Sequence, residues 1–239
     1  MSDTVLIAQD SKLTREQLAL VPTPPGTATH RPVPHIDVVN ALVETLGFRH
    51  ISVVGDEYAV SRDGMKMFGV MELDQGMHGA RFALGIRNSH DKSFRLAVTV
   101  GYRVFVCENL AFSGDFSPVL AKHSKNFSLS KALSIGVDDM QRNFKPMVEA
   151  VDRWQESQLS DVAARLIIYR AFIEGELEVP RHLARPVHEL YFNPQHGEFA
   201  PRTMWSLSNA FTSAFKELDP IPQYKATAKL AGFLEAAKG

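Results

Sequence analysis

The sequence predicts an α+β fold, in which a mostly antiparallel sheet of about five or six strands is followed by a helical C-terminal half packed on it. Two observations predict this order. Before Phe127, short β-branched and aromatic runs alternate with short turns, which antiparallel strands accept and parallel strands, with their long crossovers, do not. After Phe127, apolar residues recur every three or four positions, which is the periodicity of an amphipathic helix.

The first part of the chain predicts an arm and two helices. Residues 1–34 are expected to form an N-terminal arm or linker, because Pro22–Pro34 holds five prolines. A short helix is expected to start at Thr14–Gln17, and a longer one over Ile36–Leu46. We expect residues 35–218 to form a single α+β domain, with helix and sheet over 35–127, a helical layer over 128–218, and a tail or short helix over 219–239.

Five β-like runs are separated by turn-forming dipeptides. The expected strands are Ile51–Val54, Glu57–Ser61, Met65–Leu73, Ala80–Arg87 and Phe94–Cys107. The expected turns are Gly55-Asp56, Arg62-Asp63-Gly64 and Gln75–Gly79. Gly101 indicates a bulge or bend within the last strand.

Three helices are expected after this sheet. Ser128 or Ser130 caps the first, and Pro146 is expected to kink or split it. Ser160 caps a second helix that runs to Phe172, and Thr203 caps a third that ends near Leu218. The Pro- and His-rich residues 176–201 between them predict an irregular loop.

The charge of the chain is small but unevenly distributed. The 239 residues carry a net charge of -1, which implies no polyelectrolyte partner for the chain as a whole. From Arg81 to Lys131, however, eight Lys and Arg residues face three acids, a local charge of +5 that leaves -6 for the rest. This basic middle suits an anionic ligand, and it also suits a solvated charged face.

Several classes of protein are excluded or disfavoured. A single cysteine allows no disulfide within the chain, and no apolar run is long enough to span a membrane. The N-terminus lacks the pattern of a signal peptide, so a cytoplasmic, reducing setting is expected. No Gly-rich phosphate loop or dinucleotide motif occurs, and we expect no cofactor.

Asn88 to Asn109 places two polar clusters at the ends of one strand-rich unit. In the first cluster, Asn88-Ser89-His90-Asp91, His90 would be a general base or metal ligand oriented by Asp91. The competing interpretation is a turn whose polar side chains bond to the backbone. Nothing in the spacing separates the two interpretations.

Three catalytic or metal-binding arrangements use the same residues. Cys107 with His90 or His123 would form a nucleophile pair, but a lone cysteine at a strand end more often packs as a small apolar side chain. His90, Asp91 and His123 would be metal ligands, although they lack a compact ligand spacing and a second cysteine. His182, His188 and His196 are expected to be surface or packing residues, so we expect no metal.

A nucleic-acid surface is predicted from the alternation of the strand after Phe94. Arg95, Thr99 and Arg103 share one face of a regular strand and would form a polar outer stripe suited to phosphate contact. Lys122, His123 and Lys125 would extend this outer stripe. Phe94 and Tyr102 fall on the opposite, core face.

The motifs of this region resemble those of a family of phage/plasmid-like proteins, domain of unknown function 932. The resemblance rests on motifs that occur in the family's order over Leu13 to Leu218. They are Asn88-Ser89-His90-Asp91, Cys107-Glu108-Asn109, Lys122-His123 and, on a predicted helix, Trp205 with Asn209. Leu110 replaces the glycine usual in the family, and Phe211-Thr212-Ser213 replaces a Gln-Glu pair. Trp205 and Asn209 are also explained by a core tryptophan beside a buried amide.

Membership in the family would imply a mobile-element setting near replication and recombination genes, and no established activity. The leading hypothesis is a non-enzymatic nucleic-acid-associated protein, with single-stranded DNA as the favoured partner in replication or DNA recombination. The first alternative is a metal-dependent or His-based hydrolase or nuclease centred on Asn88, His90, Asp91 and Cys107. The second is a protein-interaction module that acts on a host factor. A homo-oligomer is compatible with each of them, and no membrane partner is expected.

Overall fold

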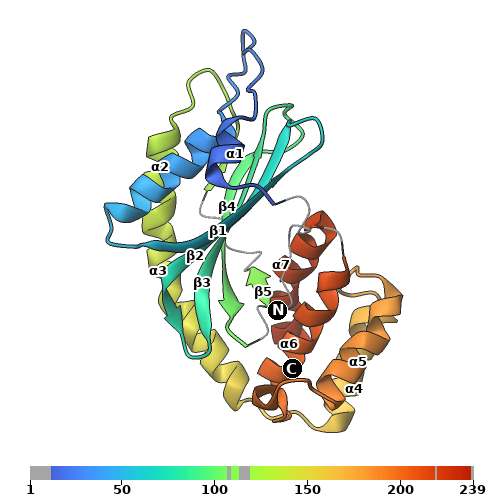
Figure 1. Cartoon of the computed structure of the whole chain (residues 1–239). Helices are drawn as coiled ribbons and strands as arrows, with labels where there is room; N and C mark the ends of the chain where they lie inside the picture. The colour runs from blue at the N-terminus through green and yellow to red at the C-terminus, as the bar shows by residue number, and fades with distance from the viewer. Residues whose placement is uncertain (1–11, 107–108, 113–118, 219, 238–239) are drawn as a thin grey trace. The chain divides into compact units, whose positions relative to one another are not determined.

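The computed structural model describes residues 12–106, 109–112, 119–218 and 220–237. By their contacts these residues fall into two compact units. Of the described residues, the N-terminal unit contains 12–103 and 119–143, and the C-terminal unit contains 104–106, 109–112, 144–218 and 220–237. The sheet comes first in the chain and the helical half second (Figure 1), which confirms the predicted α+β class.

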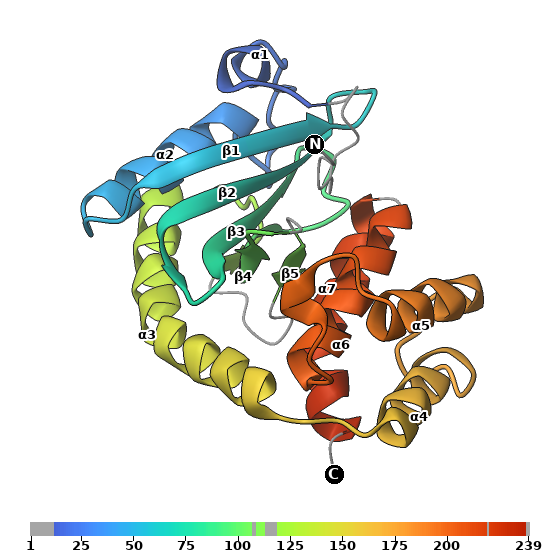
Figure 2. The same ribbon diagram turned by 60° about the horizontal axis from the view of Figure 1, so that its bottom comes forward.

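The N-terminal unit is built on an antiparallel sheet that is strongly curved (Figure 2). The strands β1 (Val53–Val60), β2 (Lys66–Met77), β3 (Ala80–Ser89) and β4 (Leu96–Val104) lie side by side in chain order, and β6 (Val119–Ala121) pairs with β4. Tyr58 faces Gly69 between β1 and β2, and Met71 faces Leu84 between β2 and β3. Chain-order neighbours joined by short turns are what the sequence predicts.

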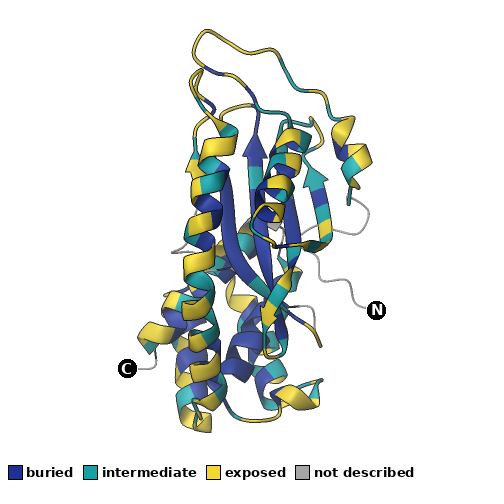
Figure 3. Cartoon of the chain, turned by 90° about the vertical axis from the view of Figure 1, so that its left-hand side faces the viewer, coloured by how far each residue is buried: buried dark blue, intermediate teal, exposed yellow. Residues whose placement is uncertain are grey.

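Helices cover one face of this sheet (Figure 3). They are α2 (His35–Gly47) and the first half of α3 (Leu129–Glu156). Arg49, just after α2, joins the two helices by donating to the Asp138 carboxylate at 2.6 Å and to the Ser134 hydroxyl at 2.8 Å. The short helix α1 (Arg15–Ala19) begins where predicted, with a capping box between Thr14 and Gln17.

Two predicted turns differ from the structure. Gly55-Asp56 is not a turn, because β1 runs from Val53 to Val60 and absorbs Gly55 at a register shift against β2. The Gln75–Gly79 turn is shorter than predicted, because β2 continues to Met77. The Asp63-Gly64 turn is confirmed, and Gly64 supplies the positive φ of 70° that it needs.

The C-terminal unit is mainly helical. Its elements are β5 (Leu110–Phe112), the second half of α3, α4 (Asp161–Phe172), α5 (Ala184–Phe192), α6 (Met204–Ala214), α7 (Pro220–Ala237) and the 3-10 turns η2 (Arg181–Leu183), η3 (Gly197–Phe199) and η4 (Phe215–Glu217). The buried rings of Phe172 and Phe211 stack at 5.6 Å in its core. Trp154 of α3 donates to the Glu235 carboxylate of α7 at 2.5 Å.

Local signals predict most of these helices but miss one. Ser160 and Thr203 cap α4 and α6 as expected, with side-chain oxygens 3.1 Å from the backbone N–H of Ala163 and Ser206. Residues 176–201 are not an irregular loop, because they contain α5. Pro186 lies in the first turn of α5, where its missing N–H removes no helical hydrogen bond. Pro146 does not split α3, which is a continuous helix through that position.

Candidate anion-binding site

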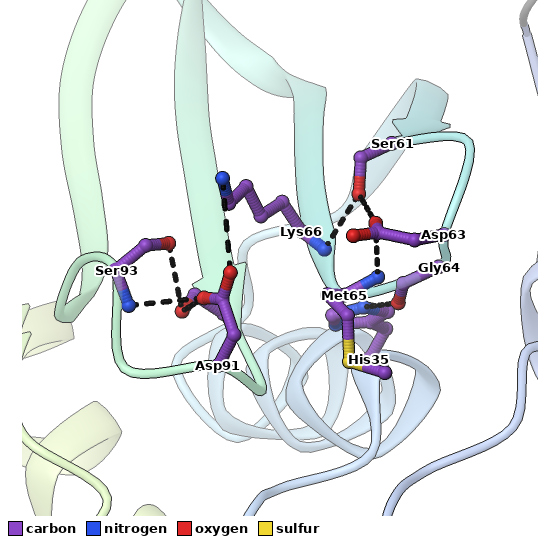
Figure 4. Close-up of polar contacts among 9 residues, drawn as sticks. His35, Ser61, Asp63, Gly64, Met65, Lys66, Asp91 and Ser93 are labelled. Carbon is purple, nitrogen blue, oxygen red and sulfur yellow. Dashed lines mark hydrogen bonds and ion pairs between the residues drawn. The ribbon is translucent and has the colours of Figure 1, made fainter.

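The Asn88–Asp91 motif forms a tight polar turn at the end of β3. The Asp91 carboxylate accepts hydrogen bonds from the Ser89 hydroxyl at 2.7 Å and the Ser93 backbone N–H at 2.9 Å. Figure 4 shows this carboxylate facing Ser93 and the ammonium of Lys66, which lies 3.7 Å away. A hydrogen bond from the Ser93 side chain is the main reason that the pKa of Asp91 lies well below its ordinary value. Asp91 therefore closes a turn, and it does not orient the His90 ring.

The Asn88 and His90 side chains of the same motif are directed into a cluster of four buried histidines. The members are His30, His35, His90 and His123, each less than a tenth exposed. The rings of His35 and His90 stack at 3.9 Å with an interplanar angle of 5°, and those of His30 and His123 stack at 5.8 Å. The Asn88 amide donates to the Val33 carbonyl and lies 2.9 Å from His35 Nδ1. The cluster brings together segments that lie up to 93 residues apart in the sequence.

Three of these rings are neutral near pH 7. Burial lowers the pKa of His35 to about 4, with a further contribution from His90. Burial and then the charge of His30 lower the pKa of His123 to about 4, and burial also lowers the pKa of His90. Both ring nitrogens of His123 and Nδ1 of His90 are buried without a partner among the described residues. His123 can therefore offer one donor and one acceptor to a ligand.

A pocket of about 550 Å³ opens beside this cluster. It is lined by Thr29, His30, Ser89, Lys92, Ser93, Phe94, Arg95, Lys122, His123 and Ser124, which we call the basic pocket. Lys92, Arg95 and Lys122 are exposed at its walls, and none of the three forms an ion pair with another described residue. No acidic side chain is part of this lining. A lining that offers cations and hydroxyl groups but no carboxylate favours an anionic ligand.

Lys92 occupies a strained position in the wall of the basic pocket. Its φ is 64°, in the left-handed region where a side chain other than that of glycine is disfavoured. We expect Lys92→Gly to raise the free energy of unfolding by about 0.5 kcal/mol, because relief of the strain exceeds the added flexibility of the unfolded chain. The same change should weaken binding of an anionic ligand about fivefold, because it removes a cation.

Lys92→Ala is the matched control for this substitution. It removes the same charge but keeps a Cβ, so binding should weaken equally while stability does not rise. Urea unfolding and ligand titration of both variants measure the two effects separately. A Lys92→Gly protein less stable than Lys92→Ala would contradict the assignment of strain to this residue.

The predicted outer stripe does not form an exposed surface. Thr99 is 1% exposed, because both faces of β4 are covered along its central residues. Arg103 is engaged with two carboxylates, Glu57 Oε1 at 2.8 Å and Glu72 Oε1 at 2.6 Å, and its side chain is 15% exposed. Arg95 alone of the three is exposed and lines the basic pocket. The one-sided alternation assumed for this strand is therefore wrong.

The basic pocket nevertheless gathers part of the predicted set. Arg95, Lys122 and His123 lie together in its lining, whereas the exposed Lys125 is not part of it. Phe94, predicted to be a core residue, is half-buried and lines the basic pocket. No motif or spacing in the sequence marks His30 and His35, which lie in and just after the Pro-rich segment. That segment contains no helix, as predicted, but it carries the His30 ring into the interior.

The second pair of motifs meets in the C-terminal unit. The buried Asn109 amide donates to the Asn209 carbonyl and to its side-chain oxygen, both at 3.1 Å, and its own oxygen accepts from Ser213 at 3.0 Å. Asn209 in turn donates to the Trp205 carbonyl at 3.0 Å. Leu110 has no positive φ and begins β5, so the left-handed turn suited to glycine is not formed there. These bonds give both asparagines a structural role in joining β5 to α6.

The alternative interpretations are constrained by the same geometry. Cys107 lies outside the described residues, so its pairing with His90 or His123 stays a prediction. Within the parts of the chain that the structure describes, no three His, Cys, Asp or Glu side chains are grouped so as to hold a metal ion. No helix in those same ranges has the length and apolar character needed to cross a bilayer.

Apolar side chains are exposed on α4 and just after it, at Val162, Leu166, Tyr169 and Ile173. This is the feature that a protein-interaction module would have.

Comparison with known proteins identifies the family. The model of the family described as "Domain of unknown function (DUF932)" matches residues 27–229. No curated protein and no solved structure shows significant similarity to the chain. The matched range includes all four histidines of the cluster, the basic pocket, and the two asparagines that join β5 to α6. The chain belongs to the DUF932 family.

Proposed function

We propose that this protein binds single-stranded nucleic acid without modifying it, and that the basic pocket holds the phosphate of the strand. The observation that carries this proposal is the charge of the lining, in which Lys92, Arg95 and Lys122 are present and no carboxylate is. Phosphate contacts from lysine and arginine supply most of the affinity of proteins for nucleic acids. The proposal also includes the cytoplasmic, phage- or plasmid-associated setting in replication or recombination that the resemblance implies.

Two features favour a single strand over a duplex. Phe94 lies in the lining beside the cations, and an aromatic ring next to a phosphate site offers a surface on which an unpaired base stacks. The His123 ring, whose nitrogens bond to no described residue, lies at the same site and is 94% buried, so only a group that enters the basic pocket can reach it. A phosphate on a flexible single strand can enter in this way, whereas a duplex holds its phosphates on a stiff outer surface.

The proposal is tested by removing the cations one at a time. We expect Arg95→Ala and Lys122→Ala each to weaken binding of a labelled single strand of about twelve nucleotides by about tenfold, measured by fluorescence anisotropy. Each loss should also reduce the slope of log affinity against log salt by about 0.7, because one fewer counterion is released. Neither substitution should affect folding, because neither side chain bonds to a carboxylate of the described residues.

Lys125→Ala provides the matched control for Lys122→Ala. Lys125 is exposed three residues along the same segment but does not line the basic pocket, so its loss should change affinity by less than about twofold. Equal effects of the two lysines would indicate a diffuse basic surface and contradict a site in the basic pocket. Unchanged affinity in both pocket variants would contradict the proposal as a whole.

A further inference from the structure

The His30 ring lies between two hydrogen-bond acceptors. Nδ1 is 2.8 Å from the His123 carbonyl oxygen, and Nε2 is 3.0 Å from the His90 carbonyl oxygen. A backbone carbonyl can only accept, so each of these bonds requires a hydrogen on the ring nitrogen. A neutral imidazole carries one such hydrogen, and only the imidazolium carries both. Both contacts are hydrogen bonds at the same time only in the imidazolium form, which an anion beside the ring would favour.

The contacts of the stacked His35 and His90 rings each need only the neutral form. His35 Nε2 donates to the Gly64 carbonyl at 3.0 Å, and its Nδ1 faces the donating amide of Asn88. His90 donates from Nε2 to the Val33 carbonyl at 3.0 Å, and its Nδ1 has no described partner. Each of these two rings thus has one donor and one bare nitrogen, and they stack at 3.9 Å as two neutral rings can.

No carboxylate within the described part of the chain is available to balance a charge on His30. The ring is 8% exposed, and no described carboxylate forms an ion pair with it. Asp91, the nearest acid along the Asn88–Asp91 motif, is bound to Ser89, Ser93 and Lys66 instead. An isolated buried charge is costly, and an anion beside it removes much of that cost. His30 is itself part of the lining of the basic pocket, so a ligand there can supply the anion.

We propose that the basic pocket is a phosphomonoester site, in which the terminal phosphate of a strand or nucleotide is held against the His30 imidazolium and bonded by the His123 ring. This inference rests on the proposed function and names the part of the strand that is bound. Lys92, Arg95 and Lys122 give the lining three positive charges and no negative one, and His30 would add a fourth when it is protonated by a bound phosphate. A terminal phosphate carries nearly two negative charges at pH 7, whereas an internal phosphodiester carries one. The monoester therefore matches this charge better.

Single strands that differ only at their ends test the proposal. The full-length protein is titrated into strands of one sequence that carry a phosphate at the 5′ end, at the 3′ end or at neither, with the dye on an internal base. We expect a phosphate at one of the two ends to raise affinity about tenfold over the hydroxyl-ended strand. Lys122→Ala should abolish this gain, and Lys125→Ala should preserve it. Equal affinity for all three strands would overturn the terminal-phosphate site while leaving strand binding intact.

Two further measurements separate this inference from the proposed function. Calorimetry with inorganic phosphate should show binding to the protein alone and loss of binding in Lys122→Ala. If phosphate binds and no strand does, the site stands and the proposed function fails. Nitrogen-15 NMR of the imidazole rings in the phosphate-bound protein should show both His30 nitrogens protonated, with His35 and His90 as single neutral tautomers. A neutral His30 in that complex would overturn the inference.

Discussion

Acidification from pH 7 to pH 4 is expected to destabilise the N-terminal unit by several kcal/mol. His35 and His123 stay neutral in the folded protein to about pH 4, whereas in the unfolded chain they accept protons near pH 6.5. The unfolded state therefore binds more protons between these values, and the free energy of unfolding falls as the pH falls through this window. Above pH 6.5 the contribution is constant. Once the pH is below the folded-state pKa, the difference between the folded and unfolded pKa values corresponds to a loss of about 3 kcal/mol in the free energy of unfolding for each ring.

Urea unfolding followed by circular dichroism at a series of pH values measures this loss. His123→Phe is the informative variant, because neither nitrogen of His123 bonds a described group and an aromatic ring of similar shape should be tolerated at pH 7. This variant should lose less stability on acidification than the natural protein. Below about pH 4, protonation of Asp91 should destabilise the fold further, because the folded state holds its pKa low. A pH-independent free energy of unfolding between pH 7 and pH 4 would contradict the burial of neutral histidines.

Arg103→Met is expected to cost about 3 kcal/mol of stability. The guanidinium joins two carboxylates from different strands, Glu57 of β1 and Glu72 of β2, and all three side chains are at most 20% exposed. Removing the arginine leaves each partly buried carboxylate with one more exposed partner, Lys12 at 2.7 Å from Glu57 and Arg81 at 3.6 Å from Glu72. Uncompensated charge of this kind is the main source of large losses at ion-pair networks.

Arg95→Met is the control for this prediction, because it makes the same chemical change at an exposed arginine just before β4. It should change stability by less than about 0.5 kcal/mol and should weaken strand binding instead. Adding Glu57→Gln and Glu72→Gln to Arg103→Met should recover part of the lost stability, because neither buried carboxylate then lacks its guanidinium, and the cations left behind, Lys12 and Arg81, are more exposed to solvent. Equal stability of the two methionine variants in urea would show that the network around Arg103 does not support the sheet.

Much of the secondary structure is predictable because its signals are local. Thr14, Ser160 and Thr203 cap helices through bonds to N–H groups three residues away, and Gly64 supplies a positive φ within one turn. Where prediction fails, the sequence allows two local outcomes and tertiary packing selects one. Gly55 suits a turn or a bulge, and its pairing with Glu72 on β2 makes it a bulge.

The face of a strand is harder to predict than its existence. Arg95, Thr99 and Arg103 alternate as an exposed edge would, but strand alternation does not report that the other face is covered as well. Thr99 is consequently buried, and Arg103 forms ion pairs with Glu57 and Glu72 on neighbouring strands of the sheet. The excess of positive charge between Arg81 and Lys131 indicated the location of a basic surface better than the alternation of side chains along β4 did, because Arg95 and Lys122 both line the basic pocket.

The histidine cluster could not be predicted from the sequence, for a different reason. His30 and His35 lie near the Pro-rich segment, His90 follows β3 and His123 follows β6, so no spacing rule connects them. The four rings come together because β6 pairs with β4 and because the Pro-rich segment packs beside β6, where His30 forms a β-bridge with Ser124. The residues of the Asn88–Asp91 motif face two ways: Asp91 closes the turn, whereas the Asn88 and His90 side chains face the cluster.

The most direct test of the central claim is a salt titration of strand binding by the natural protein. A labelled single strand and a duplex of the same sequence are titrated by fluorescence anisotropy between about 50 and 200 mM salt. The basic pocket predicts tighter binding of the single strand, with affinity that falls as salt rises with a slope of about -2, as three cations require. No binding of either nucleic acid at the lowest salt would contradict a nucleic-acid function.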